Sequence, residues 1–242
     1  MYQFDDDFNH KARFWFRKKL IKNMNWALLP KASKAIFPVI ACHVNEHGIA
    51  FPSEQTIAIL SGLTEKIVRN GIKGLEHFPS FEWKHYLTKR GRRSKKFCVK
   101  LPVENHRGKA FPFFRVVLEY GLWMKLSPTA KALYPVMRHF GFFEIDKYAE
   151  AENLEIDVND FDAVFPERPY DFCEAEFGVL AEFSGINRRS LPAAINSLEK
   201  NYLVETLSED YGWKVFLKSK DDTYFNRDYL NQMIMKKYRK PE

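Results

Sequence analysis

The chain has 242 residues, of which 45% are hydrophobic and 16% aromatic, so it can bury a substantial core in one or two domains. This apolar content excludes an intrinsically disordered chain, and three widely spaced cysteines exclude a disulfide scaffold or a zinc ribbon. The acidic start is unlike a signal peptide and no apolar run is long enough to span a bilayer, so we expect a soluble, cytoplasmic protein; its net charge of +7 indicates an anionic partner.

The positive charge lies in the first half of the chain. Residues 1–110 hold 21 Lys and Arg against 9 Asp and Glu, a net charge of +12, whereas residues 111–242 have a net charge of −5. The first basic run mixes cationic and aromatic side chains over residues 11–19, and its Arg17 and Lys18 are candidates for phosphate contacts.

The sequence contains an internal repeat. Residues 26–40 match residues 123–137 at an offset of 97, and residues 61–76 match residues 184–199 at an offset of 123. Because the offsets differ by 26, the second copy carries an insertion of about that size. We therefore expect two tandem domains of one fold, covering residues 1–108 and 109–220.

The first copy is expected to hold three helices. Apolar residues at helical spacing predict a helix over residues 31–43, and Ser53 is placed to cap a second, shorter one. A tight turn at Gly62 follows, after which Thr64 caps a third helix whose apolar stripe begins at Ile67. Two helices joined by so short a glycine turn are typical of a helix-turn-helix.

Two alternating strands follow, over residues 81–88 and 96–101, and the basic run between them is expected to form their turn. A helix-turn-helix followed by such a hairpin is a winged helix. We therefore predict an α+β, mainly helical fold of two tandem winged-helix domains. Six cations at the tip of the first wing would grip the phosphates of DNA. The predicted wing residues are Lys89, Arg90, Arg92, Arg93, Lys95 and Lys96.

The third helix of the first copy is the predicted recognition helix, which would enter the major groove and read base edges. Arg and Lys suit guanine, Asn suits adenine and Glu accepts from cytosine. Its polar side chains are Thr64, Glu65, Lys66, Arg69, Asn70 and Lys73. Ser53 and Gln55, at the start of the preceding helix, are further candidates for phosphate contacts.

The second copy is expected to hold helices over residues 129–140, 173–183 and 187–199, then a hairpin over residues 203–217 with an acidic tip. An acidic tip cannot grip phosphate. This copy could instead contact DNA through its last helix, or serve as a dimerisation or partner domain. The candidate contact residues on that helix are Asn187, Arg188, Arg189, Ser190 and Asn196.

Two segments stand apart from the repeat. The insertion over residues 141–170 is acidic and lacks EF-hand spacing, so we expect a solvated loop that repels DNA, with a protein contact as the alternative. Residues 221–242 combine apolar residues at helical spacing with a basic end, which predicts a docked helix; a disordered tail on DNA is the rival.

The stretch over residues 51–58, with Ser61-Gly62-Leu63 and Val68-Arg69, resembles the helix-turn-helix family common in plasmid and phage replication proteins. Two such domains in tandem are similar to the theta-type plasmid replication initiators. The resemblance covers residues 14–101 and 111–218. It implies binding to repeated origin sites, recruitment of host replication proteins, autoregulation and a monomer–dimer switch.

The sequence thus predicts a sequence-specific double-stranded DNA-binding protein, most simply a plasmid or phage-type replication initiator. The alternative is a dimeric transcriptional regulator with one DNA-reading and one dimerising winged helix. We expect no enzyme, cofactor or metal site, because the histidines lack metal-ligand spacing and no phosphate-cradling glycine loop is present.

Overall fold

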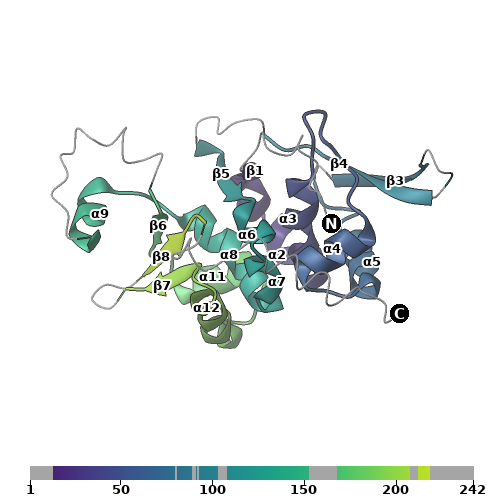
Figure 1. The fold of residues 1–242 in the computed structure, drawn as a ribbon. Coiled ribbons are helices and arrows are strands. Elements are labelled where there is room, and N and C mark those ends of the chain that lie inside the picture. The colour runs from purple at the N-terminus through teal and green to yellow at the C-terminus, as the bar shows by residue number, and fades with distance from the viewer. Residues whose placement is uncertain are drawn as a thin grey trace, which may run out of the picture.

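In the computed structural model the chain is an α+β protein, about half helical, with small antiparallel sheets (Figure 1). The structure describes residues 13–79, 81–88, 91, 93–102, 108–152, 168–207 and 212–218. Two three-stranded sheets lie toward opposite ends of the molecule, with most of the helices between them and α9 beyond the second sheet. No helix in the described ranges has the length and apolar character needed to cross a membrane.

A two-stranded ribbon ties the two copies together. Strand β1 (Arg13–Arg17) pairs antiparallel with β5 (Ala110–Phe114), which places Phe16 opposite Phe111. The two strands stand at the same offset of 97 as the repeat, so each copy begins with one of them. The rings of Phe16 and Phe111 stack, with their centroids 5.1 Å apart. The basic–aromatic run over residues 11–19 therefore contributes a strand whose aromatic side chains Phe14 and Phe16 are buried in the core.

The first copy contains the three predicted helices and the two predicted strands in the predicted order. It also has two short helices, Lys18–Lys22 and Asn25–Leu28, and a short strand, Ile49–Ala50, that were not predicted. Its sheet has the order β2-β4-β3, and its last strand begins at Arg93 instead of residue 96, so Lys95 and Lys96 belong to a strand and not to the turn. Pairing with the opposite strand extends the ladder into the basic run. The elements are α1 (Lys18–Lys22), α2 (Asn25–Leu28), α3 (Lys31–Cys42), β2 (Ile49–Ala50), α4 (Glu54–Ser61), α5 (Glu65–Gly74), β3 (Phe81–Leu87) and β4 (Arg93–Val99).

The second copy repeats this order, and its sheet β6-β8-β7 has the same topology. The elements are α6 (Val116–Glu119), α7 (Leu122–Lys125), α8 (Pro128–Phe140), α9 (Ile145–Glu152), β6 (Tyr170–Cys173), α11 (Phe177–Ser184), the 3-10 turn η4 (Arg188–Ser190), α12 (Leu191–Glu199), β7 (Val204–Thr206) and β8 (Trp213–Phe216).

Three predictions for the second copy are wrong. The helix expected from Cys173 begins at Phe177, because residues 170–173 pair with β8 as a buried strand. The helix expected from Asn187 begins as the 3-10 turn, and the α-helix starts at Leu191, where Pro192 fits the first turn. The insertion is not simply a loop, since it contains α9; residues 153–167 lie outside the described ranges.

The two copies contact each other reciprocally, as across a two-fold axis. The indole N–H of Trp26 donates to the carbonyl oxygen of Ala132 at 2.9 Å, and that of Trp123 donates to the carbonyl oxygen of Ala35 at 2.8 Å. Both pairs obey the offset of 97. Buried residues of both copies form one continuous core, from Phe14 to Val215. The division at residues 108 and 109 therefore stays a prediction.

The glycine turns show the same reciprocity. Gly62 and Gly185 both have a positive φ, of 69° and 64°, and end α4 and α11. A Cβ on Gly62 would overlap the carbonyl oxygen of Met124, and one on Gly185 would overlap that of Ala27. Each helix turn is thus packed against the backbone of the other copy, and only glycine permits the approach.

Candidate nucleic-acid interface

The predicted caps are confirmed at both helices of the first copy. The hydroxyl of Ser53 accepts from the backbone N–H of Thr56 at 2.9 Å, and that of Thr64 accepts from the backbone N–H of Ile67 at 3.4 Å. These bonds satisfy N–H groups that a helix leaves unpaired at its start. They fix where α4 and α5 begin and hence which side chains of α5 face outward.

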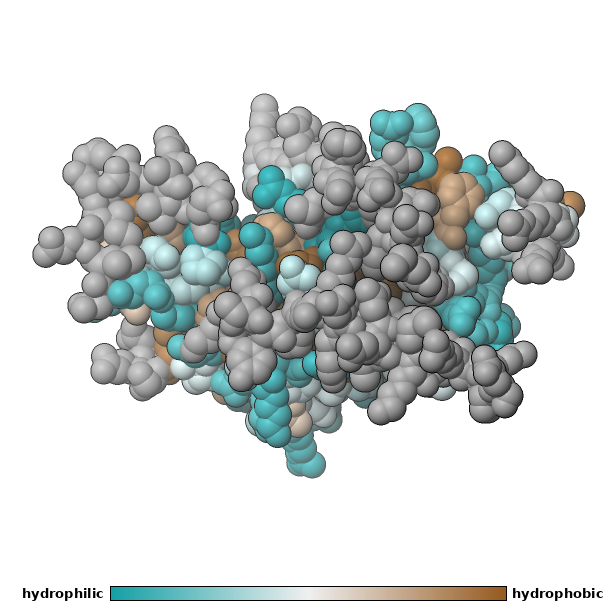
Figure 2. Space-filling view, in the orientation of Figure 1, coloured by the Kyte–Doolittle hydropathy of each residue, from teal (hydrophilic) through white to brown (hydrophobic). Residues whose placement is uncertain are grey.

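Helix α5 divides into a buried face and a polar face. Val68, Gly71 and Ile72 are buried, whereas all six predicted recognition residues are exposed. In Figure 2 hydrophilic side chains gather over the end of the molecule where Figure 1 places α5. The structure therefore brings the recognition residues together on one accessible surface.

Two glycines let α5 lie close to α3. A Cβ on Gly71 would lie 2.8 Å from the Ile36 side chain, and one on Gly74 would overlap the hydroxyl of Ser33. That hydroxyl donates to the carbonyl oxygen of Gly71 at 2.8 Å. Glycine lowers the stability of a helix, and the close packing of α5 on α3 explains its presence at both positions. This packing fixes the position of the polar face of α5 relative to α3.

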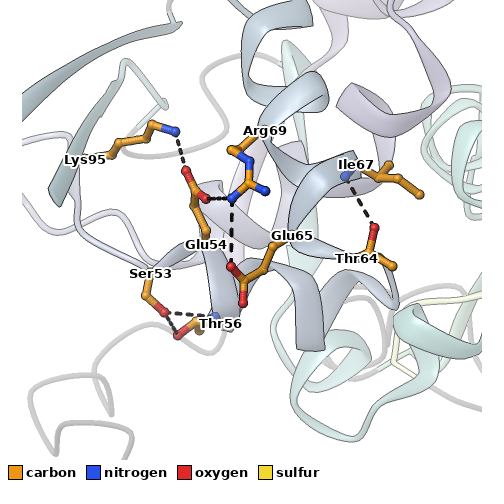
Figure 3. Close-up of polar contacts among 8 residues, drawn as sticks. All are labelled: Ser53, Glu54, Thr56, Thr64, Glu65, Ile67, Arg69 and Lys95. Atoms are coloured by element: carbon orange, nitrogen blue, oxygen red, sulfur yellow. Dashed lines mark hydrogen bonds and ion pairs between the residues drawn. The ribbon is translucent and has the colours of Figure 1, made fainter. Parts of the chain in front are cut away.

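A cluster of charged side chains joins α4, α5 and β4 (Figure 3). The guanidinium of Arg69 donates through Nη1 to Glu54 Oε2 at 3.0 Å, and the same nitrogen lies 4.0 Å from Glu65 Oε2. The ammonium of Lys95 donates to the other oxygen of Glu54. We call Glu54, Glu65, Arg69 and Lys95 the charged cluster; its formal charges cancel.

The environment keeps Glu54 ionised. Partial burial acts to raise its pKa, but the hydrogen bonds and positive charges of Lys95 and Arg69 outweigh burial and lower the pKa overall. Lys95 also makes a cation–π contact, since its Nζ lies 5.1 Å from the centre of the Trp83 ring. Its side chain is only 15% exposed, so one predicted wing cation is a fixed part of the cluster.

Of the other predicted wing residues, the structure describes the side chain of Lys96 alone. Lys96 is a half-buried strand residue beside Lys95. Lys89, Arg90 and Arg92 lie outside the described residues, as does the side chain of Arg93.

The predicted phosphate contacts also fall in two places. Ser53 and Gln55 are exposed at the start of α4, beside the cluster. Arg17 and Lys18 are half-buried at the junction of β1 and α1, and α1 contacts α8 and α11 of the second copy. The structure therefore groups Ser53 and Gln55, but not Lys18, with the polar face of α5.

In the second copy the predicted contact residues are also accessible. The side chain of Asn187 accepts from the backbone N–H of Arg189 at 2.9 Å, which confirms the predicted cap. Arg188, Arg189 and Asn196 are exposed and Ser190 is half-buried.

The charged cluster is not repeated at the equivalent positions of the second copy. At the offset of 123, Phe177 stands where the first copy has Glu54, and it packs against Trp213 with ring centroids 5.7 Å apart. Pro192 stands where the first copy has Arg69. The two outward faces therefore differ in chemistry although their folds agree.

Sequence reasoning missed two residues of this surface. Ile67 was predicted to be part of the buried stripe, yet it is 40% exposed on α5 and points away from Glu54 (Figure 3). Glu54 was not among the predicted contact residues. Its partner Lys95 lies 41 positions later, in a run that the sequence assigned to a turn, so no local pattern indicated the pair.

No group of acidic, histidine or cysteine side chains suited to a metal ion occurs in the described residues. No known protein family, curated protein or solved structure matches the chain.

Proposed function

We propose that both copies are winged helices and that the protein binds double-stranded DNA sequence-specifically. The observation that carries the proposal is the outward face of α5, where six polar side chains stand together on a helix held by the Thr64 cap and two glycine contacts. The adjoining hairpin turn supplies cations for phosphates, and the α5 side chains supply donors and acceptors for base edges.

The favoured biological role is that of a plasmid or phage-type replication initiator, in which the first copy holds DNA and the second assists or recruits host replication proteins. Two chemically different faces in one chain suit an asymmetric, directly repeated site. The alternative is a dimeric transcriptional regulator, whose two-fold axis would favour an inverted repeat. The proposal includes no enzymatic activity.

The test is selection of bound sequences from a random duplex pool, followed by footprinting on DNA that flanks the encoding gene. A directly repeated consensus supports the initiator, whereas a clean palindrome supports the regulator. Failure to enrich any sequence would refute specific DNA binding. Incubation of labelled duplex with magnesium checks the absence of catalysis, because specific nicking would contradict it.

A further inference from the structure

An acidic residue stands at the centre of the surface proposed to meet DNA. Glu54 is the first residue of α4, directly after the cap Ser53, and its side chain is 25% exposed. A carboxylate there would repel phosphates, so its presence calls for a compensating role.

The ion pair between Glu54 and Arg69 indicates what this role is. The recorded ion pairs of Arg69 use Nη1 alone, on the side that faces Glu54 and Glu65 (Figure 3). Guanine is recognised when two donors of one guanidinium address its O6 and N7 together. A side chain whose Nη1 is anchored can present its Nε and Nη2 in a fixed direction, and it loses less rotational freedom on binding than an unanchored arginine.

Glu54 bridges two elements of the first copy on the protein surface. Its two oxygens take one cation each, Arg69 from α5 and Lys95 from β4. Strand β4 of the hairpin is thereby joined, through Glu54 at the start of α4, to Arg69 near the middle of the recognition helix. Since the charges of the cluster cancel, this part of the surface adds little general attraction for phosphates.

We propose that Glu54 is a positioning and specificity-determining residue, which holds Arg69 in the orientation that reads a guanine and limits binding to unrelated sequences. The inference rests on the proposed function. It assigns the first copy alone this device, because the second copy has Phe177 and Pro192 at the equivalent positions.

The test uses the full chain and the duplex selected above. Glu54→Gln keeps the shape of the side chain and removes its charge. The ratio of affinities for the selected duplex and for unrelated duplex should fall about tenfold, the cost of losing one guanine contact. Affinity for unrelated duplex should rise. The matched control is Glu76→Gln, which removes an exposed charge just past α5 that forms no ion pair in the described residues; it should keep the ratio.

Two further measurements separate positioning from simple charge removal. Arg69→Ala should lose the same ratio, and adding it to Glu54→Gln should cost little more, because both changes remove one interaction. Replacing the guanines of the site by 7-deazaguanine, one at a time, should weaken the wild type at one position and leave the Glu54→Gln variant insensitive there. Circular dichroism checks that each variant is folded.

The outcomes are distinguishable. If the wild type enriches a sequence but the Glu54→Gln variant keeps its ratio, or if the two losses multiply, Glu54 is not a positioning residue and the proposed function stands. If the wild type shows no preference among duplexes, the proposed function fails and this inference fails with it.

Discussion

Trp26 and Trp123 each donate an indole N–H to a helix of the opposite copy, at 2.9 and 2.8 Å, and both indoles are fully buried. This exchange makes the packing of one copy depend on the other.

Trp26→Phe and Trp123→Phe should each lower the free energy of unfolding by about 2 kcal/mol, because each removes a buried hydrogen bond and part of a packed ring. Urea unfolding followed by circular dichroism measures both. We expect one cooperative transition in the wild type, since the core is continuous. Two separate transitions, or a large loss from one variant only, would show that the copies do not stabilise each other reciprocally.

Gly62→Ala and Gly185→Ala should destabilise the protein more than Gly91→Ala does. All three glycines have a positive φ, which costs alanine about 1 kcal/mol. A methyl group at Gly62 or Gly185 would also overlap a carbonyl oxygen of the other copy, whereas at Gly91 no atom of the described residues, its chain neighbours aside, lies within 4 Å of that position. We expect an extra loss of roughly 1–3 kcal/mol, measured by thermal or urea unfolding. Equal losses at all three positions would refute the close packing.

Stability should fall as the pH drops from about 6.5 towards 4. Burial, together with the charge of Arg115, lowers the pKa of His43 to about 4 even though its ring Nδ1–H donates to the carbonyl oxygen of Val39. Burial and the nearby Lys18 and Lys22 also lower the pKa of His139 to about 4.

The stability falls in acid because the unfolded chain binds more protons than the folded chain. Below pH 6.5 the unfolded chain takes up protons at both histidines while the folded chain stays neutral there until about pH 4, so acid favours unfolding. Urea unfolding midpoints at several pH values measure the slope. The slope should be shallower in a His43→Gln, His139→Gln variant than in a His47→Gln control, in which an exposed histidine is replaced. Equal slopes would contradict the assignment.

Replacing Arg90, Arg92 and Arg93 by Ala should weaken binding to every duplex sequence. Each cation that contacts a phosphate releases about one counterion, so the slope of log affinity against log salt should flatten by up to about three units. Titration of labelled duplex at several salt concentrations measures the slope. An unchanged slope would remove the hairpin turn from the interface.

Ile67→Ala should reduce a preference for thymine while leaving stability nearly unchanged, since the side chain is 40% exposed. An apolar side chain on a recognition helix can contact the methyl group of thymine. Replacing thymine by deoxyuridine deletes only that methyl. The wild type should lose affinity at one position of the selected site, and the variant should not respond there. A wild type indifferent to every such replacement would rule out the contact.

Much of the fold could be predicted because its signals are local. The caps Ser53 and Thr64 and the turn at Gly62 each depend on neighbouring residues, and the offsets of 97 and 123 can be found by comparing the sequence with itself. The strand at residues 170–173 was not predicted, and its last residue, Cys173, was assigned to a helix, because the partner strand β8 lies about 40 positions later. Sheet pairing over that distance overrides local preference.

The candidate site was predicted as a set of exposed polar and charged side chains, and the contacts among them were not predicted. Arg69 and Lys95 were assigned separate tasks, yet both are held by Glu54. Such a contact depends on how β4 lies beside α4, which no residue spacing encodes. The reciprocal tryptophan bonds were missed for the same reason, although the repeat that produces them was visible.

The joining of the two copies in one chain alters how the molecule can change during evolution. In a homodimer every substitution appears twice, so a residue that suits one half must be tolerated by the other. Here each codon specifies a residue in one copy only, so the two copies can change separately. Glu54 can stay charged while its counterpart Phe177 fills an apolar gap against Trp213. The pairing also survives any dilution, because no second molecule is needed to complete it.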